Sequence, residues 1–146
     1  MYSSIIRVSL ISATVAASVA FASPALADMV TYKAELKGSS VVPPSDSKGT
    51  GTLTVTYDTA SKKLTWKGTY MGLTGAATAA HFHGPAEVGK NAGVAVPITP
   101  ATSPMDGTAT LTDAQAADLS AGKWYVNVHT AKFPDGEIRG QVITGK

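Results

Sequence analysis

The chain has 146 residues, and its length fits one domain with a sizeable core. Its formal net charge of +2 is too small to indicate binding to nucleic acid or to an anionic membrane surface. It contains no cysteine, which excludes disulfides, thiolate metal ligands and a cysteine nucleophile.

Residues 1–27 are typical of a secretory signal peptide. Arg7 gives a positive start, an apolar run follows from residue 8 to about 21, and Ala25-x-Ala27 is a signal-peptidase pattern. An uncleaved membrane anchor is the alternative, although the apolar run is short for a span. Cleavage leaves one domain at 28–146 with a net charge of +1, because Arg7 is the only charge removed. We therefore expect a periplasmic or secreted protein that does not associate with the membrane after cleavage.

Short runs rich in Thr, Val and Tyr, separated by Gly, Pro and Asp, predict an all-β domain. In chain order, strands are expected at 30–37, 51–57, 63–70, 76–83, 94–98, 107–111, 123–130 and 137–143. The clearest hairpin joins 51–57 to 63–70, since both alternate apolar and polar residues around a turn. Pro97 predicts that 94–98 lies at a sheet edge.

One short helix is expected between Thr112 and Ala121. Thr112 fits the N-cap, Gln115 completes a capping box, and Gly122 suits the left-handed position after the last turn. About eight strands and one short helix predict an antiparallel Greek-key β-sandwich, or a related barrel.

The three histidines are the most informative residues of the chain. His81 and His83 are two apart on a predicted strand, so both side chains project from one face with Cα atoms about 6.6 Å apart. His129 lies on the strand 123–130 and can supply a third nitrogen if the two strands are neighbours. Three imidazoles suit Cu²⁺ or Zn²⁺. The alternative is a structural cluster that only forms hydrogen bonds.

Side-chain alternation along 123–130 places His129 on the same face as Tyr125 and Asn127. The opposite face carries Trp124, Val126 and Val128 and is expected to belong to the core. Tyr125 or Asn127 can then orient an imidazole. The alternative is that both are ordinary exposed strand residues.

Further ligands are less strongly indicated. Glu87 can add an oxygen, but it is expected in solvent, and Met71 and Met105 can serve Cu⁺, although a packing role is more typical. Glu137 and Arg139 lie on one face of the last strand and are expected to pair across strands. The sequence has no phosphate-binding glycine loop and no G-x-S-x-G motif.

Two stretches resemble the CHRD domain, which is named after chordin: HFHGPAEVGKNAGVAVPI and GKWYVNVHTAKFPDGEIRGQV. The resemblance extends from about Val30 to Val142. It implies an extracytoplasmic β-sandwich and little about activity, since the bacterial stand-alone forms are mostly without an assigned function.

A looser likeness is to the copper site of copper/zinc superoxide dismutase, where His81, His83 and His129 would match three copper ligands. A fourth histidine and the cysteines of that family's disulfide are missing here, so the likeness implies a mononuclear site.

The leading hypothesis is a secreted or periplasmic binding module with one metal ion, copper before zinc, on these three histidines. The first alternative is a metal-free interaction domain, in which the loop 84–93 contacts an extracytoplasmic protein or a glycan. The second is a copper redox enzyme similar to superoxide dismutase. A binding role is favoured over an enzymatic one.

Overall fold

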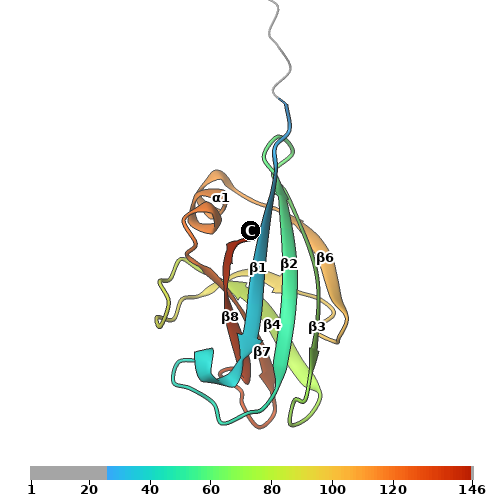
Figure 1. The fold of residues 1–146 in the computed structure, drawn as a ribbon, viewed down its shortest axis with the longest axis vertical. Coiled ribbons are helices and arrows are strands. Elements are labelled where there is room, and N and C mark those ends of the chain that lie inside the picture. Colours follow the sequence, from blue (N-terminus) through green and yellow to red (C-terminus); the bar gives the residue numbers. More distant parts are fainter. Residues whose placement is uncertain (1–25, 146) are drawn as a thin grey trace, which may run out of the picture.

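Eight strands form one continuous antiparallel sheet in the computed structural model, which describes residues 26–145 (Figure 1). The elements are β1 (Met29–Lys37), the 3₁₀ turn η1 (Gly38–Ser40), β2 (Thr50–Asp58), β3 (Lys63–Met71), β4 (Ala77–His83), β5 (Val94–Ile98), β6 (Met105–Thr110), α1 (Asp113–Ser120), β7 (Trp124–Thr130) and β8 (Ile138–Thr144). The all-β prediction, with eight antiparallel strands and one short helix, is confirmed.

The order of the strands in the sheet is β5-β4-β7-β8-β1-β2-β3-β6. The sheet curls until its two edge strands, β5 and β6, come into contact, so it is nearly closed like a barrel. The predicted hairpin of β2 and β3 is present, with Asp58 opposite Lys63. Pro97 does lie on an edge strand, as its missing N–H requires.

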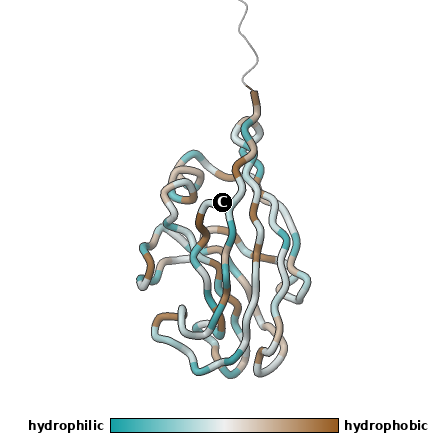
Figure 2. Tube along the Cα trace, in the orientation of Figure 1, coloured by the Kyte–Doolittle hydropathy of each residue, from teal (hydrophilic) through white to brown (hydrophobic). Residues whose placement is uncertain are grey.

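Side-chain alternation explains why these segments become strands. In β1, Tyr32, Ala34 and Leu36 are buried while their neighbours are exposed, and β2 repeats the pattern. The hydropathy of the chain alternates in the same way along the strands (Figure 2). Inside the curled sheet, Phe82 packs against Trp66 and Trp124 with ring centres 5.2 and 5.7 Å apart.

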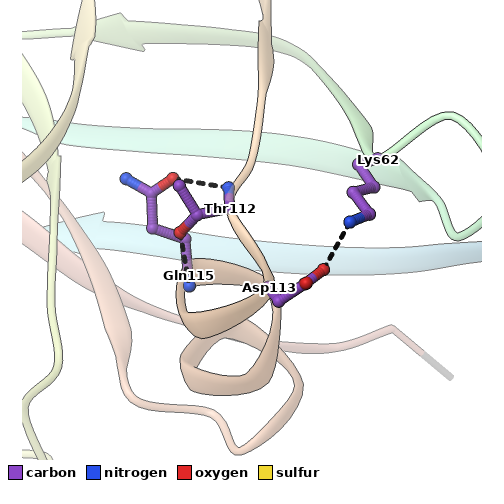
Figure 3. Close-up of polar contacts among 4 residues, drawn as sticks. All are labelled: Lys62, Thr112, Asp113 and Gln115. Atoms are coloured by element: carbon purple, nitrogen blue, oxygen red, sulfur yellow. Dashed lines mark hydrogen bonds and ion pairs between the residues drawn. The ribbon is translucent and has the colours of Figure 1, made fainter.

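The helix α1 starts where the sequence predicts. The Thr112 side chain accepts a hydrogen bond from the Gln115 amide, and the Gln115 side chain accepts one from the Thr112 amide (Figure 3). Leu119 anchors the helix in the core with no exposed surface, and Gly122 follows at a φ of +71°. The capping box prediction is therefore confirmed.

We expect Thr112→Ala to lower the free energy of unfolding by about 1 kcal/mol, because it removes the acceptor at the N-cap. Lys62→Ala is the matched control: it removes an exposed ion pair with Asp113 beside the same helix end (Figure 3) and should change stability little. Urea unfolding of both variants measures the difference. An equal loss in the two would refute the capping role.

The predicted signal peptide falls almost entirely on residues 1–25, outside the described part of the chain, and stays a prediction. Among residues 26–145, no helix is long and apolar enough to cross a membrane.

Candidate metal centre

The strands that carry the histidines, β4 and β7, are neighbours in the sheet, between β5 on one side and β8 on the other. They run antiparallel, with His83 opposite Tyr125, His81 opposite Asn127, and Ala79 opposite His129. The adjacency on which a shared site depends is therefore present.

The three imidazoles face one another on the outer side of these two strands. One ligand nitrogen from each of His81, His83 and His129 can be chosen so that all lie within 4.8 Å of one another. His81 Nδ1 lies 3.3 Å from His129 Nε2, and its ring meets the ring of His83 edge-on with centres 5.4 Å apart. The sequence thus identified the three members of this cluster correctly, whereas metal binding itself is untested.

Two of the imidazoles have a fixed tautomer. His83 Nδ1 lies 3.0 Å from the Ala92 carbonyl oxygen, and His129 Nδ1 lies 2.8 Å from the Pro134 carbonyl oxygen. A carbonyl only accepts, so each Nδ1 must carry the proton, and each neutral ring has its lone pair on Nε2. His83 Nε2 is buried and has no hydrogen-bond partner. It is therefore free to act as a ligand.

Tyr125 holds His83 in two ways. The two rings are stacked, with centres 4.8 Å apart and an angle of 2° between planes. The Tyr125 hydroxyl also accepts a hydrogen bond from the Ala92 amide and donates one to the Ala92 carbonyl, at 3.1 and 3.2 Å. Tyr125 thereby positions the carbonyl that fixes the His83 tautomer.

Asn127 contacts the turn that holds His129. Its side-chain amide donates to the Asp135 carbonyl at 3.2 Å, next to Pro134, whose carbonyl holds His129. The turn comes so close that a Cβ on Gly136 would lie 2.2 Å from Asn127 Oδ1. Tyr125 and Asn127 are only 2% and 5% exposed, so their alternative interpretation as ordinary exposed residues is wrong. Tyr125 orients His83 through the Ala92 carbonyl, and Asn127 holds the turn next to the carbonyl that binds His129.

The comparison with known families identifies the domain. The CHRD domain model matches residues 32–142, most of the chain, including all three histidines. The chain belongs to the CHRD domain family. No curated protein and no solved structure matches it. The looser likeness to copper/zinc superoxide dismutase finds no support in these comparisons.

Arg139 lies beside the histidine cluster of this CHRD domain, a position that the sequence did not predict. Its guanidinium carbon lies 3.4 Å from the centre of the Tyr125 ring, and its nitrogens donate to Asn91 Oδ1 and the Lys90 carbonyl at 2.8 and 2.6 Å. Arg139 thus fixes both Tyr125 and the 84–93 loop, which contains Ala92. The register of the last two strands is the signal that could have located Arg139, because it places Arg139 opposite Asn127 on β7.

The expected pairing of Glu137 and Arg139 across strands is not found, since neither forms an ion pair among residues 26–145. The Glu137 carboxylate is fully buried and accepts hydrogen bonds from Ser47, Thr74 and Thr130. Burial alone would raise the pKa of Glu137, but these hydrogen bonds lower it below its ordinary value.

The electrostatics of the cluster favour neutral rings. Burial lowers the pKa of His81, and the neighbouring His129 lowers it further. Burial also lowers the pKa of His83, where it outweighs the opposing hydrogen bond to Ala92. Both imidazoles are therefore neutral at pH 7, which is the form that binds metal ions.

The other ligands that the sequence suggested do not belong to the cluster. Glu87 is exposed and lies 3.5 Å from the Lys123 ammonium. Met105 is buried in the core, and Met71 is 73% exposed at the end of β3. The chemistry of the site is therefore that of three imidazoles.

Proposed function

We propose that this CHRD domain is a periplasmic or secreted binding module that holds one metal ion on His81, His83 and His129. The observation that carries the proposal is the buried Nε2 of His83, which lacks a hydrogen-bond partner and sits on a ring that clusters with the imidazoles of His81 and His129. A buried nitrogen acceptor without a partner is costly, and a bound metal ion removes that cost.

The spacing of the nitrogens suits a first-row transition metal. Ligands about 2.0–2.1 Å from a tetrahedral ion lie about 3.3 Å from one another. His81 Nδ1 donates a hydrogen bond to His129 Nε2 at that same distance, 3.3 Å, and becomes a ligand when its proton moves to the other ring nitrogen. The ligand nitrogens of the three rings lie within 4.8 Å of one another, so an approach of up to about 1.5 Å brings His83 to the same spacing. Copper is preferred to zinc because a site of nitrogen ligands binds Cu²⁺ more tightly. Metal buffering or delivery in the cell envelope is the role that follows.

The competing function is a metal-free interaction domain. It is favoured by the hydrogen bonds that already hold the rings: His83 to Ala92, His129 to Pro134, and His81 to His129. In that case the histidines only brace the outer face of the sheet. The 84–93 loop would then present the contacts to an extracytoplasmic protein or glycan.

Calorimetric titration with Cu²⁺ and Zn²⁺ distinguishes the two functions. The untagged protein should bind one Cu²⁺ more tightly than Zn²⁺, and His81→Ala/His83→Ala should bind neither above background. Glu87→Gln is the control, because it removes an exposed carboxylate outside the cluster and should bind like the parent. Equal heats for the parent and the double variant would refute the metal site and favour the interaction domain.

We expect Tyr125→Phe to weaken copper binding about tenfold, as removal of a group that orients a ligand typically does. The substitution keeps the ring that stacks on His83 but removes the hydroxyl that holds Ala92. Competition with a chelator of known affinity measures the change. An unchanged dissociation constant would mean that Ala92 holds His83 without help from Tyr125.

A further inference from the structure

A cavity of about 420 Å³ opens on the outer face of the sheet, beside β1 and β8. Lys37 and Arg139 are the charged residues in its wall, and no acidic residue lines it. Val42, Pro44 and Val88 give the wall an apolar part. Its volume lies within the range of about 300–1,000 Å³ that is usual for small-molecule sites.

Arg139 is a buried cation without an anionic partner. It is 2% exposed, and none of the ion pairs among residues 26–145 includes it. Burial lowers the pKa of Arg139, which means that the charged form is destabilised in this environment. A buried charge of this kind is stabilised by an opposite charge that approaches it.

The guanidinium also has donors to spare. Arginine carries five N–H groups in a planar fork, and the hydrogen bonds of Arg139 go to Asn91 Oδ1 and the Lys90 carbonyl. These two contacts and the Tyr125 ring fix the plane of the fork. A planar carboxylate matches such a fixed fork better than a point-like anion does.

We propose that this cavity binds a small organic acid, with its carboxylate at Arg139 and Lys37 and its apolar body against Val42, Pro44 and Val88. The site lies beyond the proposed metal function, because none of the three histidines lines the cavity. The apolar wall selects against inorganic anions, and the absence of acidic lining residues selects against cations.

The probe is 4-phenylbutyrate, and 4-phenylbutyramide is its uncharged counterpart. Each compound is titrated into the metal-free protein, and ¹⁵N NMR follows the backbone amides and the Arg139 Nε–H signal. We expect a dissociation constant near 1 mM for the acid and binding at least about tenfold weaker for the amide, since the amide lacks the charge that Arg139 attracts. The Arg139 signal should shift with the acid. The His81→Ala variant, which removes a proposed metal ligand and leaves the stack of His83 on Tyr125 in place, should bind equally well, which separates this site from the metal site.

Two variants test the location without disturbing the buried arginine. Lys37→Ala should weaken binding of the acid about threefold, because it removes a positive charge from the wall. Val88→Glu, at a position that is 78% exposed, should weaken binding about tenfold, because it adds a carboxylate that repels the acid. Lys63→Ala removes an exposed lysine on β3, outside the cavity, and should have no effect.

Three results would overturn the proposal. The first is equal binding of the acid and the amide, or no shift at about 20 mM acid, which is far above the expected constant. The second is binding of inorganic phosphate as tight as that of the acid. The third is tighter binding of a peptide with an apolar C-terminal residue than of 4-phenylbutyrate, which would identify a protein terminus as the occupant.

Discussion

Glu137→Ala is expected to lower the free energy of unfolding by about 3–5 kcal/mol. The carboxylate accepts hydrogen bonds from Ser47 Oγ, Thr74 N, Thr74 Oγ1 and Thr130 Oγ1 at 2.5–2.8 Å, and it is fully buried. Alanine leaves these donors buried without an acceptor. It also disconnects the 41–49 loop, the turn before β4 and the end of β7, which meet at this one side chain.

Urea unfolding at pH 7 measures the loss. Glu87→Ala is the control, since Glu87 is exposed and forms only a surface ion pair with Lys123. A loss in Glu137→Ala no larger than in the control would show that water replaces the carboxylate at no cost.

The same carboxylate makes stability depend on pH. Its pKa in the folded protein is below its ordinary value of 4.5, so the unfolded chain binds the proton more readily. The stabilisation is complete at neutral pH and is lost as the pH falls below about 4.5 and through the lower folded value. Glu137→Gln should therefore lose less stability between pH 7 and pH 3 than the parent does. Identical losses would contradict the pKa direction.

His83→Phe should separate metal binding from folding. We expect copper affinity to fall at least about 100-fold, which is about 2.7 kcal/mol, because one of three ligands is removed. In the absence of metal, the free energy of unfolding should change by less than about 1 kcal/mol. Phenylalanine can keep the stack on Tyr125, and it replaces a buried Nε2 that has no partner. The Ala92 carbonyl retains the Tyr125 hydroxyl as a donor.

Chelator competition and urea unfolding of the same metal-free samples give both quantities. Ile143→Phe is the control, because it adds an aromatic ring at an exposed position on β8, outside the cluster. If His83→Phe loses several kcal/mol of stability without metal and the parent binds no copper, His83 is a structural residue.

The sequence predicted much of the fold because side-chain alternation is a local property. The face of β7 that carries Trp124, Val126 and Val128 is fully buried, as predicted, and the histidines lie on the opposite side of the sheet. The last two predicted strands, 123–130 and 137–143, do form neighbouring antiparallel strands, β7 and β8. The adjacency of β4 and β7 joins segments far apart in the chain, so only the fold could establish it.

The surroundings of the cluster depend on long-range contacts that no local pattern contains. Tyr125 and Asn127 alternate as exposed residues do, yet the 84–93 loop and the 134–136 turn cover them. The atoms that fix His83 and His129 are backbone carbonyls of Ala92 and Pro134, and a carbonyl has no signature in a sequence. For the same reason, the hydrogen-bonded burial of Glu137 could not be read from its neighbours.

Both strands that carry the histidines are hydrogen-bonded on each side: β4 to β5 and β7, and β7 to β4 and β8. The backbone beneath the cluster is thus rigid before any ion arrives, and the entropy of bringing the imidazoles together is lost when the chain folds. Loading and removal of an ion should then leave the far-ultraviolet circular dichroism unchanged, unlike in zinc fingers, which unfold without metal. Under the proposed metal function, the protein would exchange its ion while remaining folded, which is what a reversible carrier requires.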